Sequence, residues 1–244
     1  MPGGQEPFRL GEDSSRHIVT VLRMRNSERL LLTDGRGRLA EVEILDADKK
    51  KTLVKFILPG AVQAARGDVP ELYQAVSQGL QQRDRELILA VSLLKNTARF
   101  EWILEKATEI GVTAIIPLVC KRTERVSFRQ DRLHQIVISA MLQSRQAWLP
   151  ELREPTPLEK FIAEPFDGRS YIAHCLPEER QALRAHAPGE AARILIGPEG
   201  DFTPDEIRQA LDAGFLPVIL GQTRLRTETA AVVAAALLKD AISR

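Results

Sequence analysis

The sequence feature that most constrains the fold is a pair of short apolar segments near the C-terminus, each closed by a glycine. Residues 193–196 run into Gly197, and residues 217–220 run into Gly221. Aliphatic runs of this length that end at a turn residue predict buried strands. Between them, Thr203 is followed by a proline and, three residues after the threonine, by a glutamate, which is typical of a helix start. The order strand, helix, strand predicts an α/β sheet with mostly parallel strands.

The two glycine loops are expected at the carboxyl ends of adjacent strands, which is where open parallel sheets bind ligands. Glycine has no Cβ, so backbone groups in such loops can approach a ligand closely. Arg224 and Arg226 in the second loop favour a nucleotide-like ligand. The alternative is that the two glycines only turn the chain. Neither loop matches the phosphate-binding pattern GxxxxGK[ST] or the dinucleotide pattern GxGxxG, so these residues alone leave the ligand class open.

From residue 72 onward the chain alternates between strand and helix patterns. Strands are predicted at 73–77, 87–94, 114–119 and 170–174, and helices at 98–110, 132–144 and 178–185. A last helix begins at Thr227 or Thr229 and is so rich in Ala, Val and Leu that we expect it to be buried on most sides. Residues 71–244 are therefore predicted to form one α/β domain.

Residues 1–70 follow a different pattern, with short strands predicted at 30–33, 39–45 and 52–58 and a hairpin turn at 34–37. A short helix is predicted at 16–25, capped by residues 13–15, with Ile18, Val21 and Leu22 on one face. Short strands joined by tight turns, with a single helix, fit a small β-barrel. Residues 59–70 are interpreted as the linker to the second domain.

The composition is that of an ordinary globular protein, with 44% hydrophobic and 27% charged residues among 244. No run approaches the ~20 apolar residues that span a bilayer, and the N-terminus lacks a signal-peptide pattern, so we expect a cytoplasmic protein. Cys120 and Cys175 lack metal-ligand spacing and are expected to be free thiols in a reducing compartment. The four histidines form no metal-spaced set, so no metal is predicted.

Local charge indicates where RNA could bind, although the net charge of the chain is only +1. Residues 16–38 hold six arginines and two acidic residues, and residues 121–132 hold five basic and two acidic residues. Phosphate contacts need only a local basic face. The alternative interpretation, solvated surface charge, stays open on these counts.

Several motifs, taken together, resemble the SPOUT methyltransferases, and within them the family that methylates N3 of a uridine in 16S ribosomal RNA. They are IGPEGDFTPDE at 196–206, LGQTRLRTETA at 220–230, FEWILEKATEIGV at 100–112, RHIVTVLRMR at 16–25, and Gln143-Ser144-Arg145 with LPEL at 149–152. The resemblance covers nearly the whole chain in order. Two departures are Asp201, where a third glycine is usual, and Met141-Leu142, where an acidic residue is common before Gln-Ser.

This resemblance implies a PUA-like RNA-binding β-barrel domain at 1–70 and a SPOUT methyltransferase domain at 71–244 with a C-terminal trefoil knot. It also implies a homodimer, S-adenosyl-L-methionine as cofactor, and 16S ribosomal RNA within the 30S particle as substrate. The cofactor would be held by the two glycine loops and by a further loop after His174. The cofactor-binding residues that the resemblance implies are Ile196, Gly197, Pro198, Glu199, Gly200, Leu220, Gly221, Leu225, Arg226 and Thr227.

Methylation at uridine N3 needs help from the protein, because N3 carries a weakly acidic proton and the neutral nitrogen is a poor nucleophile. A nearby cation would stabilise the anion that develops on the uracil, and a carboxylate could take the proton. Arg226 and Glu228 flank the second glycine loop, supply both types of group, and are the predicted catalytic residues. The alternatives are a surface salt bridge for Arg226 and a favourable contact with the helix dipole for Glu228.

The residues predicted to contact RNA are basic and polar members of these motifs and clusters. They are Arg16, Arg23, Arg25, Lys95, Arg99, Lys106, Arg122, Arg125, Gln143, Ser144 and Arg145. A second class of function stays open, namely a non-catalytic RNA-binding or ribosome-assembly protein that keeps the fold and needs no cofactor. A third is a nucleotide-binding enzyme of another α/β type, which the missing phosphate-cradle motif disfavours.

Overall fold

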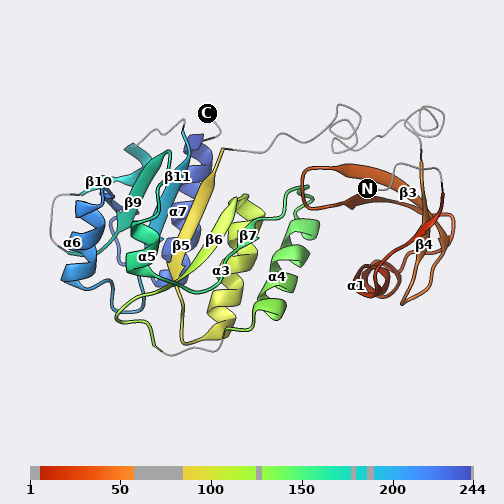
Figure 1. Cartoon of the computed structure of the whole chain (residues 1–244), viewed down its shortest axis with the longest axis horizontal. Coiled ribbons are helices and arrows are strands. Elements are labelled where there is room, and N and C mark those ends of the chain that lie inside the picture. Colours follow the sequence, from red (N-terminus) through yellow and green to blue (C-terminus); the bar gives the residue numbers. More distant parts are fainter. Residues whose placement is uncertain (1–5, 58–84, 125–127, 177–179, 186–189, 243–244) are drawn as a thin grey trace. The chain divides into compact units, whose positions relative to one another are not determined.

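The computed structural model divides the chain into two compact units, Met1–Arg83 and Asp84–Arg244, and each is described by itself. The residues that the structure describes are 6–57, 85–124, 128–176, 180–185 and 190–242 (Figure 1). The predicted domain boundary between residues 70 and 71, the linker at 59–70 and the strand at 73–77 all lie outside these ranges. They therefore stay predictions.

The N-terminal unit is built on a four-stranded antiparallel sheet with the strand order β1-β4-β3-β2. Its strands are β1 (Phe8–Arg9), β2 (Arg29–Thr33), β3 (Leu39–Asp46) and β4 (Leu53–Phe56). The β2–β3 hairpin pairs Thr33 with Leu39 at its turn end, so the predicted hairpin is confirmed. Val42, Ile44 and Val54 form the buried centre of this unit, because alternate residues of a strand point to the same face.

The helix of this unit lies earlier in the chain than predicted. Helix α1 (Glu12–Arg16) is followed by one π-helical turn (His17–Val21), and no side chain caps the start at Gly11. A helix is therefore present in this part of the unit, but the predicted bounds 16–25 and the cap at 13–15 were wrong. The π turn also changes the helical period. Ile18 is buried as predicted, whereas Val21 and Leu22 are 63% and 52% exposed.

The C-terminal unit contains an eight-stranded sheet with the order β10-β12-β9-β11-β5-β6-β7, and β8 pairs with β6. Every pair in it is parallel. The strands are β5 (Leu87–Ser92), β6 (Ala114–Val119), β7 (Glu151–Leu152), β8 (Thr156–Pro157), β9 (Arg169–Ala173), β10 (Gln181–Ala182), β11 (Ala192–Ile196) and β12 (Leu216–Ile219). The helices are α3 (Thr97–Ile110), α4 (Gln130–Gln143), α5 (Leu158–Ile162), α6 (Pro204–Asp212) and α7 (Thr227–Ile242). The predicted mostly parallel α/β sheet is confirmed.

Both faces of this sheet are covered by helices, which explains why its central strands are apolar throughout (Figure 1). Along β11, Ile194 and Ile196 pack into the core shared with α3, α4 and α7. Leu195 points the other way, into the core shared with α5 and α6. The trefoil knot that the resemblance implies stays a prediction.

The helix predicted at 178–185 was wrong. Residues 177–179 lie outside the described ranges, and the rest forms the short edge strand β10 and a 3-10 turn (Leu183–Ala185). Gln181 and Ala182 pair with Val218 and Ile219 of β12. Pairing with the sheet edge therefore overrides the local helix preference of this segment.

Candidate active site

The two glycine loops meet at one edge of the parallel sheet, through the first residue of α7. The Thr227 hydroxyl donates a buried hydrogen bond of 3.0 Å to the carbonyl oxygen of Gly197. Thr227 closes the loop that begins after β12, and Gly197 follows β11. The expectation that these loops lie at adjacent strands was wrong in one respect, because β9 lies between β11 and β12. The loop after β9, which contains His174 and Cys175, therefore belongs to the same edge.

The first glycine loop is shaped by close packing and by two left-handed residues. A Cβ added at Gly197 would lie 3.0 Å from the Phe202 ring and 3.2 Å from its backbone nitrogen. Gly200 has a φ of +93°, and Asp201 has a φ of +68°. The Asp201 N–H donates to the Pro198 carbonyl at 3.0 Å and closes the turn. Glycine is therefore required at position 200 because of its backbone conformation. At position 197 it is required because a larger residue would collide with Phe202.

Two polar side chains hold this loop from outside. The Arg122 guanidinium, which follows β6, donates to the carbonyl oxygens of Gly200, Asp201 and Phe202, the last at 3.3 Å. Glu206, only 3% exposed, forms the predicted capping box with Thr203 and also accepts from the Lys121 N–H at 2.7 Å. The loops after β6 and β11 are therefore fixed to each other.

The second glycine loop is open where the first is tight. No atom lies within 4 Å of a Cβ added at Gly221. Arg224 and Arg226 are exposed. The Arg226 carbonyl accepts a 2.8 Å bond from the Ala230 N–H, so this residue is joined to the first turn of α7. The backbone of Arg226 is therefore anchored while its side chain faces solvent.

Glu228 has one carboxylate oxygen without a donor. Its side chain is 13% exposed, and Oε1 lies 3.6 Å from Nε of Arg99. Oε2 is buried and has no hydrogen-bond partner among the described residues. The same Arg99 makes a 2.9 Å ion pair with Glu199 of the first glycine loop. Arg99 therefore links the first loop to the first turn of α7. The Oε2 atom of Glu228 can still accept a hydrogen bond from a ligand.

The predicted cofactor-binding residues lie on the two loops as expected from sequence. Ile196, Gly197, Pro198 and Thr227 are buried, whereas Glu199, Gly200, Gly221 and Arg226 are exposed and Leu220 and Leu225 are intermediate. Burial of the first group fits a role in shaping the loops, and exposure of the second leaves it accessible. Their contact with a cofactor stays a prediction.

The predicted RNA-binding residues of the C-terminal unit fall into two groups at opposite edges of the sheet. Lys95, Arg99 and Arg122 lie at the carboxyl edge, where Lys95 pairs with Glu124 at 2.9 Å and this bond raises its pKa. Lys106 lies farther along α3, and Gln143–Arg145 lie at the far end of α4. Each helix has 14 residues and so is about 21 Å long. The two groups are therefore separated by about the length of these helices.

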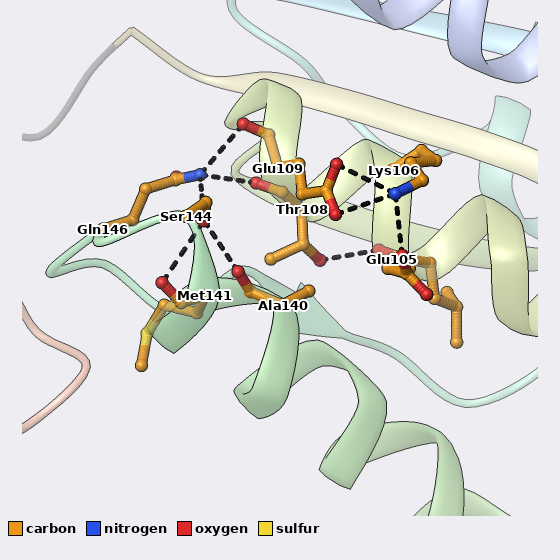
Figure 2. Close-up of polar contacts among 9 residues, drawn as sticks. Glu105, Lys106, Thr108, Glu109, Ala140, Met141, Ser144 and Gln146 are labelled. Atoms are coloured by element: carbon orange, nitrogen blue, oxygen red, sulfur yellow. Dashed lines mark hydrogen bonds and ion pairs between the residues drawn. The ribbon is translucent and has the colours of Figure 1, made fainter. Parts of the chain in front are cut away.

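Figure 2 shows the second group, in which polar side chains connect the ends of α3 and α4. The Gln146 amide donates to the carbonyl oxygens of Thr108 at 2.7 Å and Glu109 at 3.1 Å. The Ser144 hydroxyl donates to the Ala140 carbonyl at 2.7 Å. Lys106 lies between Glu105 and Glu109, whose hydrogen bonds raise its pKa. These contacts give Ser144 and Lys106 a structural role, and their contact with RNA stays a prediction.

In the N-terminal unit, Arg16 pairs with Glu12 at 2.9 Å, while Arg23 and Arg25 are both exposed at the turn that follows the π-helical segment. Arg23 has a φ of +56°, so this turn is sharp. Arg125, also predicted to contact RNA, lies outside the described residues. RNA contact by these four arginines stays a prediction.

A cavity of about 430 Å³ lies at the amino edge of the sheet, away from the glycine loops. It is lined in part by Arg193, which is 5% exposed and stacks on the rings of Phe161, Phe166 and Phe215 at 4.6–5.3 Å. Its guanidinium also donates to the Glu164 carbonyl at 3.0 Å, and burial lowers its pKa. Aromatic faces and helix-end carbonyls thus account for this buried charge, and we interpret it as structural.

Neither a metal site nor a membrane helix is found in the described part of the chain. No three His, Cys, Asp or Glu side chains gather there in a way that could hold a metal ion. None of its helices has the length and apolar character needed to cross a bilayer. Cys120 is buried beneath the loop after β6, and this burial raises the pKa of its thiol to about 12.

A small antiparallel sheet followed by a parallel α/β unit with paired strand-end loops is the arrangement of RNA methyltransferases with a PUA domain. The RNA methyltransferase domain profile matches residues 81–239, and the RNA methyltransferase PUA domain profile matches residues 10–57. The chain is 31% identical over 233 residues to ribosomal RNA small subunit methyltransferase E of Mycobacterium bovis, covering 91% of this chain and 82% of the relative. The chain belongs to the RNA methyltransferase family that includes these small subunit methyltransferases.

Two solved structures extend the similarity to the whole fold. The crystal structure of a probable rRNA methyltransferase from Porphyromonas gingivalis gives a TM-score of 0.81 at 36% identity, over 98% of this chain and 94% of that chain. A ribosomal RNA small subunit methyltransferase E from Neisseria gonorrhoeae, bound to S-adenosyl methionine, gives a TM-score of 0.80 at 26% identity, over 96% and 92%.

Proposed function

We propose that this protein transfers a methyl group from S-adenosyl-L-methionine to N3 of a uridine in 16S ribosomal RNA. The observation that carries the proposal is the joining of the two glycine loops by Thr227, beside a carboxylate with a free acceptor. Family membership supports the reaction class, and the Neisseria relative with bound S-adenosyl methionine supports the cofactor. We propose that the substrate is the RNA within the 30S particle.

The loops fit a cofactor of this kind. Gly221 has free space where a side chain would otherwise stand, and Gly200 and Glu199 are exposed on the facing loop. Backbone groups at Gly221 would therefore be accessible to an adenosyl group. S-adenosyl-L-methionine supplies an activated methyl group, and the protein's task is to align the acceptor and manage its proton.

Glu228 is the group that we propose to accept the N3 proton. Its Oε2 is buried without a donor among the described residues, and a buried acceptor of this kind is completed by a hydrogen bond. Arg99 holds the other oxygen at 3.6 Å and so orients the carboxylate. Arg226 would donate to a uracil carbonyl as negative charge builds on the ring. The proposed proton acceptor, Glu228, and the proposed cation, Arg226, thus lie two residues apart at the start of α7.

The protein is proposed to act as a homodimer. Helix α7 buries Ala231, Ala234 and Leu238 against its own unit. Its outward side carries Val232, Val233 and Ala236, which are only partly covered or exposed. A second copy of the chain would remove this apolar side from water.

The proposal is tested by replacing Gly221 with valine. Because no protein atom lies within 4 Å of the added Cβ, the fold should be kept, and the side chain should instead fill the space of the ligand. We expect S-adenosylmethionine affinity, measured by calorimetry, to fall at least tenfold with unchanged far-ultraviolet circular dichroism. Gly11→Val, also in open space but in the N-terminal unit, is the matched control and should bind normally.

The product is tested separately, by nucleoside mass spectrometry of 16S ribosomal RNA after reaction with the wild-type protein. N3-methyluridine is the expected product. Normal cofactor binding by Gly221→Val would contradict the placement of the cofactor. RNA binding without any S-adenosylmethionine binding by the wild type would favour the non-catalytic alternative.

A further inference from the structure

Asp201 occupies a backbone conformation that residues with a side chain seldom adopt. Its φ is +68°, and it directly follows Gly200, whose φ is +93°. Glycine adopts this region without steric cost, whereas for residues with a Cβ it is less favourable. Aspartate is among the residues that tolerate it best, because its side chain can bond locally. The hydrogen bonds of its carboxylate explain why an aspartate can occupy this position.

The Asp201 carboxylate joins two loops that are distant in sequence. Oδ2 accepts from the Cys175 N–H at 2.7 Å, and Oδ1 accepts from its neighbour's N–H, that of Phe202, at 2.9 Å. Cys175 follows β9, and β9 lies between β11 and β12. The loop after β9 is therefore fixed to the first glycine loop by a charged hydrogen bond.

Two arginines make further hydrogen bonds to residues of these two loops. Arg122 donates to the Asp201 carbonyl at 3.4 Å from the loop after β6. The Arg180 guanidinium donates to the His174 carbonyl, just before Cys175. The Asp201 carboxylate joins the β9 and β11 loops directly, whereas Arg122 contacts the β11 loop and Arg180 makes a hydrogen bond within the β9 loop.

We propose that Asp201 is a positioning residue that holds Cys175, at the start of the loop after β9, beside the first glycine loop as part of the cofactor site, and thereby sets the affinity for S-adenosylmethionine. The inference rests on the proposed function. If the loop residues are already ordered before the ligand binds, binding does not have to supply the free energy of ordering them. The affinity is therefore higher. The proposal concerns cofactor affinity and not the chemical step.

The two roles that Asp201 can have, positioning and plain stability, respond differently to substitution by glycine. Asp201→Gly removes both acceptors but also removes the strain of a positive φ. Cys175 is exposed, so water can take the place of the carboxylate as the partner of its N–H. We therefore expect the melting temperature of Asp201→Gly to stay unchanged or to rise. A cofactor affinity that falls at the same time would separate positioning from stability.

The experiment compares three variants by calorimetry with S-adenosylmethionine. Asp201→Gly should bind about tenfold more weakly, which corresponds to about 1.4 kcal/mol. Asp201→Asn tolerates the same φ but has one oxygen in place of two, so it should fall between wild type and Asp201→Gly. Asp48→Asn is the matched control, since Asp48 of the N-terminal unit also accepts two backbone N–H bonds, both of 2.8 Å. It should bind like the wild type.

Two further measurements keep the test independent of folding. In steady-state methylation, Asp201→Gly should raise the KM for the cofactor with little change in kcat, as expected when uniform binding is weakened. Amide hydrogen exchange at Cys175 should become faster in the same variant. Unchanged affinity in Asp201→Gly, with faster exchange at Cys175, would overturn the inference. A wild-type protein that does not bind S-adenosylmethionine would instead overturn the proposed function.

Discussion

At the scale of single residues, Arg226 provides the sharpest test of the chemistry. Its backbone is anchored by the bond to Ala230, and its guanidinium offers several N–H donors in a fixed planar fork. Removing one such donor from a transition state typically costs ~3 kcal/mol, or about a hundredfold in turnover. Arg226→Ala should therefore lower single-turnover methylation about a hundredfold while RNA affinity changes little. Arg226→Lys should recover only part of the rate, because a point charge lacks the planar fork.

The contrary result has a clear meaning. If Arg226→Ala methylates at the wild-type rate once RNA is saturating, then Arg226 contributes to binding only. Glu228 would then be the next group to substitute, with Glu228→Gln as the variant that keeps the shape of the side chain and removes its basicity.

Local chemistry predicted some site residues well and missed others for a physical reason. Gly200 and the Thr203 capping box follow from backbone rules that act within a few residues. The partners of Arg99 and Arg122 could not be predicted, because Glu199 and Gly200 lie 100 and 78 residues away in sequence. Asp201 had a signal, its departure from the usual glycine, but the signal did not say which amide it would bind.

At the scale of elements, most strands and helices were predicted within a few residues, because their burial gives a strong period. The Asn96 cap and the left-handed Gly111 bound α3 where local rules place a start and an end. The misses were short elements. They include a helix shifted by a π turn and an edge strand formed from a segment with helix-like composition. The short elements β7, β8 and α5 were not predicted at all. The first two depend on tertiary contacts more than on local preference.

Helix α7 carries the element-scale prediction. Ala236 is exposed on the outward side of the helix, so an aspartate there should leave the fold of one chain intact. A charge buried between two copies would be costly without a partner. Ala236→Asp should therefore sediment as a monomer at micromolar concentration, where the wild type sediments as a dimer. Gln209→Asp on the exposed side of α6 is the control and should remain dimeric. An active wild-type monomer would contradict the proposal.

At the scale of the whole molecule, the two-unit organisation was predictable, because the change from a β-rich to an alternating pattern is visible along the chain. The order of the strands was not. Sequence patterns do not reveal which strands are neighbours, so the insertion of β9 between β11 and β12 appeared only in the structure. That insertion brings Cys175 to the candidate site.

The N-terminal unit carries the whole-molecule prediction, which concerns salt. Removal of one phosphate-binding side chain should reduce the slope of log affinity against log salt by about 0.7 to 0.9. Replacing Arg23 and Arg25 together by alanine should weaken RNA binding and flatten this slope by about 1.5, with unchanged cofactor affinity. Arg208→Ala, at an exposed site on α6 paired with Asp205, should leave the slope unchanged. An unchanged slope in the double variant would mean that these arginines are only a solvated surface.

The strand order also has a consequence for how the protein is made. All six residues of β5 are buried in the folded unit. One of its two edges cannot pair until β11 has been synthesised, and β11 begins roughly 100 residues later in the chain. At a synthesis rate of about 5–20 residues per second, the backbone groups of this edge stay unpaired, and the apolar side chains beside it incompletely covered, for about 5–20 seconds. Newly made chains should therefore depend on cellular chaperones during that interval, and the need should ease once β11 has emerged.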